Sequence, residues 1–230
     1  MDDDLDLRNF SGRSRLFPLP RVVLFPHAVL PLHIFEPRYR QMTEDALADD
    51  QLVTIVQLRS ETSATAGALG SPPIETVGCL GRILQHERLP DGRYNFLILG
   101  RKRVRLGREV PTGKPYRTAE VEIMDDFQDD LPEEPRRSEL IGLFRRAFER
   151  RQPLDPDLTA ILENALPLAV LTDIVAHALG LPAEVKQLLL ADPRVDGRAE
   201  ALLSILRRII DHEPESAGGG RPFPPPFSPN

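Results

Sequence analysis

The stretch that decides the fold is Leu16–Arg40, LFPLPRVVLFPHAVLPLHIFEPRYR. Prolines at near-regular intervals interrupt two short apolar runs, Val22–Phe25 and Val29–Phe35. Proline fixes φ and cannot donate to a sheet ladder, so such runs are confined to edges, bends and first positions of strands. The stretch therefore predicts short, bent strands that wrap a small barrel, followed by a helix that begins at Pro37. The side chains expected to share one face of this helix are Tyr39, Met42, Thr43 and Ala46.

Strand signals continue to about residue 126. Leu52–Leu58 is a β-branched apolar run, and Ile74–Leu89 has the length of a long strand or a strand pair. The sequence Pro90-Asp91-Gly92 is a strong turn signal that predicts a hairpin into Tyr94–Leu99. Tyr116–Met124 alternates apolar and polar residues, which is typical of a strand with one buried face.

The hydrophobic period changes after Asp125. The acid-rich run Asp125–Glu134 is expected to be a solvated connector, and helices are expected beyond it. Pro167 and Pro182 suit first helical positions, and Asp192 with Pro193 suits a cap followed by a first position. Apolar residues at helical spacing form five stripes: Leu140, Phe144, Ala147 and Phe148; Leu158, Ile161, Leu162 and Ala165; Leu168, Leu171, Val175 and Leu179; Val185, Leu188 and Leu189; and Val195, Ala199, Leu202, Leu206 and Ile209.

These signals predict an α+β protein with a β-rich lobe over residues 14–126 and a helical lobe over 127–212. Residues 1–13 are expected to be a flexible acidic segment, and Arg59–Pro73, rich in Ser, Thr, Gly and Ala, a long loop. Residues 213–230 are rich in proline and glycine and are expected to be disordered, since they cannot bury enough apolar surface to order themselves.

Composition excludes several classes of protein. The net charge of −6 argues against general attraction to nucleic acid or to anionic membranes. The single cysteine, Cys79, cannot form an internal disulfide, and no cluster of Cys and His suggests zinc. No apolar stretch is long enough for a transmembrane helix, and the start MDDDLDL is unlike a secretory signal. The expected location is the cytoplasm.

Four stretches carry a resemblance to a known family. FPLPRVVLFP and LPLHIFEPRYRQM, at residues 17–26 and 30–42, resemble the opening of the LON N-terminal domain, the substrate-recognition module of Lon proteases. Residues 77–106 are similar to the central hairpin of that family, and residues 171–209 to its closing helices. The resemblance covers roughly residues 14–212 in the right order.

The resemblance implies a PUA-like β pseudo-barrel lobe with one helix, followed by a C-terminal helical lobe, and it implies binding of protein substrates. The remaining Lon machinery is not expected, because the closest approach to a phosphate-binding loop is Gly107–Pro115, GREVPTGKP. It has one residue too many between the glycines and a proline where the Mg²⁺-binding hydroxyl belongs. No serine lies in a recognisable nucleophile turn, so no catalytic residue and no cofactor is expected.

Two other groupings have ordinary explanations. His27 and His33 would point to the same side of an extended chain, but no third ligand falls at a matching spacing, so no metal site is expected. Arg101, Lys102, Arg103, Arg105 and Arg108 alternate in part with apolar residues, as on a strand with one solvated face. RNA binding is disfavoured because there is no glycine–aromatic signature and the charge elsewhere is acidic.

The expected function is therefore non-catalytic recognition of unfolded protein segments or of a protein partner. The candidate binding residues lie in the proline-stiffened segment, near the expected crease between the lobes: Leu30, Leu32, Phe35 and Tyr39. Two alternatives stay open, a PUA-like module that binds RNA or a small ligand, and an unrecognised hydrolase. The sequence leaves the partner and the oligomeric state undefined.

Overall fold

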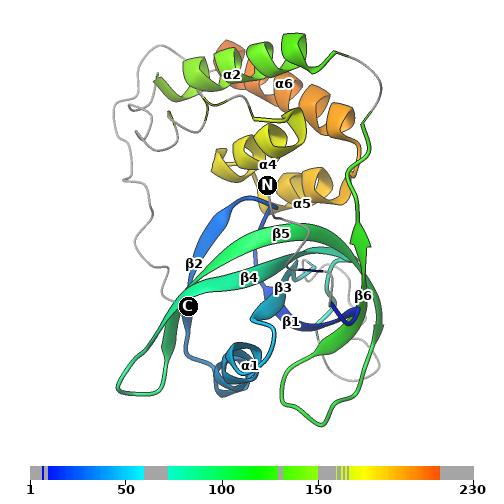
Figure 1. The fold of residues 1–230 in the computed structure, drawn as a ribbon. Helices are drawn as coiled ribbons and strands as arrows, with labels where there is room; N and C mark the ends of the chain where they lie inside the picture. The colour runs from blue at the N-terminus through cyan, green and yellow to red at the C-terminus, as the bar shows by residue number, and fades with distance from the viewer. Residues whose placement is uncertain are drawn as a thin grey trace. The chain divides into compact units, whose positions relative to one another are not determined.

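The computed structural model describes residues 10–59, 72–128, 132–149 and 166–212, together with Leu7, Thr159, Leu162 and Asn164. Most of the expected loop after Arg59, most of the stripe from Leu158 to Ala165, and the expected disordered tail lie outside these residues. Within the described part the protein is α+β, with a mixed sheet and helices (Figure 1). Contacts between Cα atoms divide the chain into two compact units. A sheet unit contains residues 1–125 and 180–191, and a helical unit contains residues 126–179 and 192–230.

Among the described residues, the sheet unit contains six strands whose order is β2-β5-β4-β3-β1-β6. β5 also pairs with β6, so the ladder β5-β4-β3-β1-β6 closes on itself, and β2 is left outside as an extra strand on β5. Among these six strands, the pair β1 and β3 is parallel and the other pairs are antiparallel. The strands are β1 (Arg13–Leu19), β2 (Val29–Ile34), β3 (Leu52–Gln57), β4 (Val77–Arg88), β5 (Tyr94–Glu109) and β6 (Thr118–Met124).

The predicted strand at Val22–Phe25 is wrong, because the first strand, β1, ends before it. Arg21 has a φ of 56°, which turns the chain between Pro20 and Val22. The run that follows is buried without joining the sheet, and Leu24 and Phe25 are fully inaccessible. Its backbone passes so close to Gly100 of β5 that a Cβ at that position would collide with the carbonyl oxygen of Phe25. The apolar run therefore fills the core as irregular chain.

Helix α1 (Pro37–Leu47) begins at the predicted proline. Its predicted face is confirmed: Tyr39, Met42, Thr43 and Ala46 are its buried residues. The turn at Pro90-Asp91-Gly92 is also confirmed, since it joins β4 to β5. The expected loose N-terminal segment differs from the structure at Leu7, which is 8% exposed and packs with Leu52, Leu80, Val104 and Val121.

Helix α5 (Ala183–Ala191) belongs to the sheet unit, although it falls within the expected helical lobe. The side-chain nitrogen Nε2 of Gln187 donates to the carbonyl of Val77 in β4, at 2.9 Å. The buried residues of α5 are Gln187, Leu189 and Leu190, whereas Leu188 is 72% exposed. The prediction that Leu188 lies on the apolar face is therefore wrong.

The helical unit contains α2 (Glu133–Glu149), α4 (Leu168–Ala178) and α6 (Val195–His212). The three helices pack on one another, and the seam predicted for the last helix is confirmed except at Ile209, which is half-buried while Ile210 is buried. Its residues Val195, Ala199, Leu202 and Leu206 are at most 1% exposed. No helix among the described residues is both long enough and apolar enough to span a membrane.

Candidate functional site

Side chains of β2 alternate between two faces of the sheet. Leu30 and Leu32 pair with Ile98 and Phe96 of β5, which are 0% and 3% exposed, so this is the buried face. The residues between them lie on the opposite, open face. We call the open-face side chains of β2, together with the next one along the chain, the β2 strip: Val29, Pro31, His33 and Phe35.

The β2 strip is largely apolar and accessible. Val29 is 43% exposed, Phe35 is 39% exposed, and Pro31 is also exposed. The rings of His33 and Phe35 stack with their centroids 6.3 Å apart, which places the two side chains on the same side. Exposed large apolar side chains that lie next to one another are unusual on a soluble domain and mark candidate binding surfaces.

The neighbouring strands extend this apolar surface. Leu97 and Leu99 of β5 pair with Pro31 and Val29 and are half-buried. In β4, a register shift between Ile83 and Gln85 leaves Leu84 in a bulge, and its side chain is 49% exposed. Val29 and Leu84 were not among the predicted binding residues. The face of β2 that carries Val29 and the bulge at Leu84 both depend on the pairing between strands, which the sequence does not show.

The four predicted binding residues therefore fall into three environments. Phe35 lies in the β2 strip, and Leu30 and Leu32 are half-buried on the other face. Tyr39 is only 7% exposed, because its ring packs on Phe17 of β1 with 4.4 Å between centroids. The guanidinium of Arg38 lies 4.6 Å from the same ring, and burial raises the pKa of the Tyr39 hydroxyl. Tyr39 therefore packs α1 against β1 and is not part of the accessible surface.

Charges beside the β2 strip are compensated locally. His33 Nδ1 lies 2.7 Å from the side-chain oxygen of Asn95. Arg93 pairs with Asp91 at 2.6 Å, and Arg38 pairs with Glu36 at 2.7 Å. Each of these arginines therefore has its own carboxylate.

Helix α1 is fixed to the loop between β5 and β6 by a polar cluster. The hydroxyl of Tyr116 donates to Asp45 at 2.6 Å, and Lys114 lies 2.9 Å from the same carboxylate. Burial and this hydrogen bond raise the pKa of Tyr116 to about 12. Although burial opposes it, hydrogen bonds from Tyr116 and Lys114 hold the pKa of Asp45 below its usual value. The cluster is saturated with internal partners, which suits a structural role.

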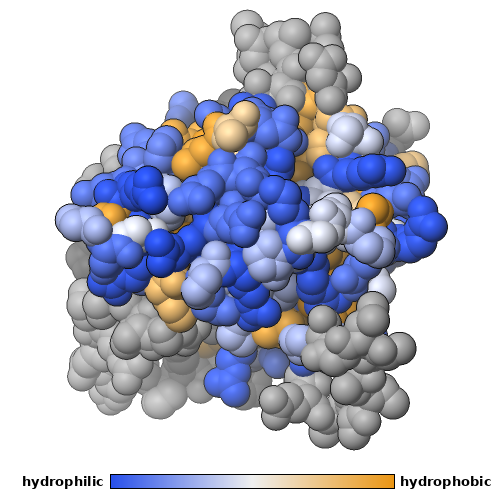
Figure 2. All heavy atoms as spheres, turned by 90° about the horizontal axis from the view of Figure 1, so that it is seen from below, coloured by the Kyte–Doolittle hydropathy of each residue, from blue (hydrophilic) through white to orange (hydrophobic). Residues whose placement is uncertain are grey.

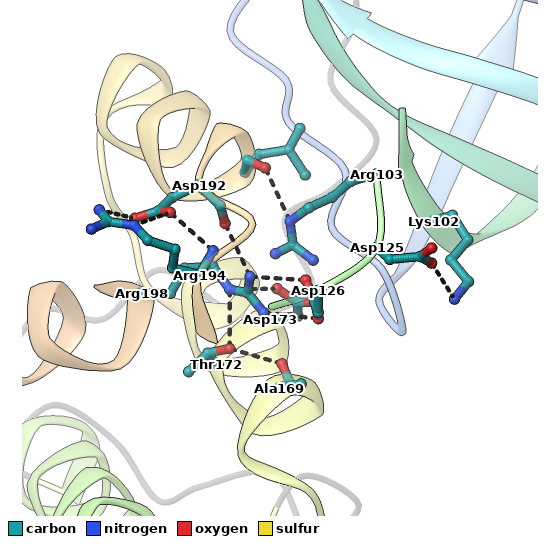
Figure 3. Close-up of polar contacts among 11 residues, drawn as sticks. Lys102, Arg103, Asp125, Asp126, Ala169, Thr172, Asp173, Asp192, Arg194 and Arg198 are labelled. Carbon is teal, nitrogen blue, oxygen red and sulfur yellow. Dashed lines mark hydrogen bonds and ion pairs between the residues drawn. The ribbon is translucent and has the colours of Figure 1, made fainter. Parts of the chain in front are cut away.

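The solvated face predicted for the basic run on β5 is found at Arg105 and Arg108, which are exposed, but not at Arg103. Arg103 is 2% exposed, and its Nε donates to the carbonyl of Leu190 in α5, at 3.0 Å (Figure 3). The alternation along β5 was correct, but a helix covers the outward face at this residue. Lys102 lies 3.7 Å from Asp125 and Arg108 lies 3.1 Å from Glu120, so acids interrupt the remaining basic surface.

A second charged cluster, in the helical unit, surrounds a buried arginine. Arg198 of α6 is 1% exposed and donates to both carboxylate oxygens of Asp126, at 2.9 and 3.0 Å (Figure 3). It also donates to the carbonyl of Asp192 and to the hydroxyl of Thr172, and it lies 3.7 Å from Asp173. Asp126 is exposed, as expected for a solvated connector, but its carboxylate is paired with Arg198, which the sequence did not predict.

The connector is also held by its backbone. The amide of Phe127 donates to the carbonyl of Pro193 at 2.9 Å, and the amide of Val195 donates to the carbonyl of Phe127 at 2.8 Å. Because the guanidinium of Arg198 faces carboxylates, a hydroxyl and a carbonyl at once, the cluster has the partners of a buried ion pair rather than the open position of a catalytic group.

The histidines are dispersed. His27 has a φ of 64° and lies in a turn, while His33 contacts Asn95 on β5. His86 is exposed and His177 is half-buried. In the part of the chain that the structure describes, no three His, Cys, Asp or Glu side chains gather as a metal site would require.

The surface is not apolar throughout. The side of the molecule where α1 lies in Figure 1 is mainly hydrophilic, with small separate apolar areas (Figure 2). A contiguous apolar strip on a sheet is therefore a local feature, and it is the strongest candidate for a functional site among the described residues.

An α+β protein with a closed ladder, an extra edge strand and a helical unit at its C-terminal end is a known class of domain. The ATP-dependent protease La (LON) substrate-binding domain matches residues 14–208, and the chain belongs to this family. The chain is 30% identical over 199 residues to a Lon protease of Xanthomonas oryzae pv. oryzae, a match that covers 85% of the chain and 23% of that protein. The chain thus spans about a quarter of the length of the curated relatives that it matches.

Two solved structures share the fold. The Lon N-terminal domain protein from Xanthomonas campestris superposes with a TM-score of 0.61 at 23% identity, covering 84% of this chain and 97% of that one. The N-terminal domain of the Mycobacterium avium complex Lon protease gives a TM-score of 0.65 at 17% identity, covering 87% of this chain and all of that one. At these identities the likeness concerns the fold alone.

Proposed function

We propose that this protein is a non-catalytic recognition module that binds unfolded protein segments, or a partner with an equivalent apolar segment, through the β2 strip. The observation that carries the proposal is the exposure of Val29 and Phe35 on one face of an ordered strand. Membership of the LON substrate-binding domain family supports it, because that family is described by the binding of substrate.

The physical properties of the strip suit apolar binding. Pro31 reduces the freedom of the unbound strand, so little ordering cost is added when a ligand contacts it. Arg38 and Arg93 are each paired with an acid, so neither presents an unbalanced charge beside the strip. Binding should therefore depend on removal of apolar area from water and respond only modestly to salt.

The alternatives have less support. For RNA, the basic residues of β5 would have to be accessible, yet Arg103 is buried and Lys102 and Arg108 have acidic partners. The closed ladder supports the view that the sheet unit is a PUA-like pseudo-barrel, but binding of a ligand has to be argued from a site and not from the fold. We also infer that the chain has no catalytic activity of its own and acts in the cytoplasm.

Fluorescence anisotropy with a labelled, reduced and alkylated protein tests the proposal. Phe35→Ser should weaken binding about tenfold, equivalent to about 1.4 kcal/mol of lost apolar burial. Leu188→Ser is the matched control, because Leu188 is 72% exposed on α5, away from the strip, and binding should be unchanged. The same titration with a labelled RNA, across a salt series, tests the alternative.

Three results would overturn the proposal. The first is equal loss of binding in Phe35→Ser and Leu188→Ser, which would indicate non-specific binding to exposed apolar side chains. The second is tight, salt-sensitive RNA binding with no affinity for unfolded protein. The third is hydrolysis of ATP or cleavage of the unfolded protein that persists after purification to homogeneity.

A further inference from the structure

Strand β2 has a free edge. In the part of the chain that the structure describes, β2 pairs with β5 alone and stands first in the order of the sheet. In an antiparallel pair, alternate residues direct their N–H and C=O groups toward the partner strand, and the residues between them direct these groups away. The free edge of β2 therefore carries the backbone groups of every second residue.

Two observations identify those residues. The amide of Gly100 donates to the carbonyl of Ala28 at 2.9 Å, so Ala28 faces β5, and by alternation Leu30 and Leu32 face it too. Pro31 has no N–H, so its place in the ladder is tolerated only where that group would point away from the partner. Both observations assign Val29, Pro31 and His33 to the free edge.

We propose that an uncharged, extended segment of another protein adds to this free edge as a further strand of the sheet. This inference rests on the proposed function and specifies the form of its ligand. The edge presents the N–H of Val29 and of His33 and the carbonyls of Val29, Pro31 and His33. A polypeptide in the extended conformation can satisfy such groups in regular succession.

Side chains and charge define the segment further. The residues that face the free edge are also residues of the β2 strip, so an added strand would lie beside apolar side chains on its open face. A ligand with an apolar residue at every second position would place those residues against Val29 and Phe35. Arg38 and Arg93 are each paired with an acid, so neither offers an unbalanced charge to an acidic segment, and this favours an uncharged one.

Pro31 limits the strength of this addition. It withholds one donor from the centre of a six-residue strand. Natural edge strands use proline in this way to discourage pairing with a second copy of the same strand. Replacement of Pro31 by valine supplies the missing N–H where nothing in β5 requires it, and it should therefore strengthen strand addition.

The test uses the full chain and a labelled eight-residue peptide of alternating valine and threonine. Pro31→Val should tighten binding about 2- to 10-fold, the effect of one net hydrogen bond, and Val29→Pro should weaken it by a similar factor. Val29 is the first residue of β2, where proline is compatible with the strand, and thermal melts check that the variant folds. The same peptide N-methylated at every residue should bind at least about tenfold more weakly, because neither of its edges can donate.

The outcomes separate the two proposals. Suppose that unfolded protein binds and that Phe35→Ser weakens this binding, but that the affinity for the peptide is changed neither by N-methylation nor by the two β2 variants. Strand addition is then wrong, and recognition by the strip stands. If Pro31→Val forms a dimer by sedimentation and gains no affinity for peptide, the free edge favours a second copy and the assigned ligand is wrong. If unfolded protein does not bind at all, the proposed function fails as well.

Discussion

Replacement of Arg198 by methionine should be the most informative perturbation of the helical unit. The guanidinium is 1% exposed and contacts Asp126, Asp173, Thr172 and the carbonyl of Asp192. Methionine retains most of the apolar stem and removes the charge. Breaking a buried ion pair by removal of one partner typically costs about 3–5 kcal/mol, because the remaining charge is left in a poorly hydrated site.

The two carboxylates should respond differently. The side chain of Asp126 is 29% exposed and can be hydrated by water when Arg198 is replaced, whereas that of Asp173 is 1% exposed and cannot. Adding Asp173→Asn to Arg198→Met should therefore recover about 1–3 kcal/mol, which lies within the roughly 0.5–3 kcal/mol found for coupled neighbours. Adding Asp126→Asn should recover less than about 0.5 kcal/mol, and it serves as the matched control.

Urea unfolding followed by circular dichroism at 222 nm measures these differences, since most of the helix lies in this unit. With a slope of about 2 kcal/mol per M, a loss of 4 kcal/mol shifts the midpoint by about 2 M. Unchanged slopes among the variants are required for the comparison. A loss below about 1 kcal/mol in Arg198→Met, or equal recovery by the two asparagine variants, would refute the assignment of Arg198 as the buried charge that compensates Asp173.

Two further predictions concern the two units separately. In the helical unit, Leu206→Ala should cost about 2–5 kcal/mol, because the side chain is fully buried, while Ser204→Ala on the exposed face should change stability by less than about 0.5 kcal/mol; urea unfolding compares them. In the sheet unit, the pKa of Tyr116 is raised to about 12, so its contribution to stability is complete below pH 10 and is lost as the pH rises toward 12. Melting temperatures at pH 8.5–11.5 should fall less steeply in Tyr116→Phe, and parallel curves would contradict the prediction.

Local patterns in the sequence were sufficient to predict those elements whose structure depends on residues close together in the chain. The start of α1 followed from Pro37, and its buried face from the spacing of Tyr39, Met42 and Ala46. The hairpin between β4 and β5 followed from Pro90-Asp91-Gly92. In each case the deciding interactions join residues that are close in sequence, so periodicity and turn chemistry carry the information.

Hydrophobic periodicity did not predict the environment of side chains whose contacts lie far away in the sequence. It placed Arg103 on the outward face of its strand but could not show that α5, 87 residues away, covers that face. It placed Asp126 correctly in an exposed connector, but it could not show that a guanidinium 72 residues away pairs with its carboxylate. Buried charges need a specific partner, and the sequence does not show which distant residue supplies it.

The same limit applies to the candidate site. The proline-rich segment was identified correctly as stiff and apolar, but the choice of Leu30 and Leu32 over Val29 depended on which face of β2 is buried. That face is set by the pairing of β2 with Ile98 and Phe96. A shift of register by one residue would exchange the two faces, so no property of the segment alone could decide between them.

Pro31 lies at the free edge of β2 and therefore also affects which chains can pair with this strand. A strand that binds extended segments must leave its backbone groups accessible, and an accessible edge is also a site for self-association. Proline at the centre of the edge meets both requirements. It removes a single N–H donor, leaves the N–H groups of Val29 and His33 in place, and keeps the strand ordered. Because two copies of β2 would each lack that donor, self-pairing is penalised twice, whereas addition of a foreign strand is penalised once. This difference favours weak binding of other chains over binding of a second copy.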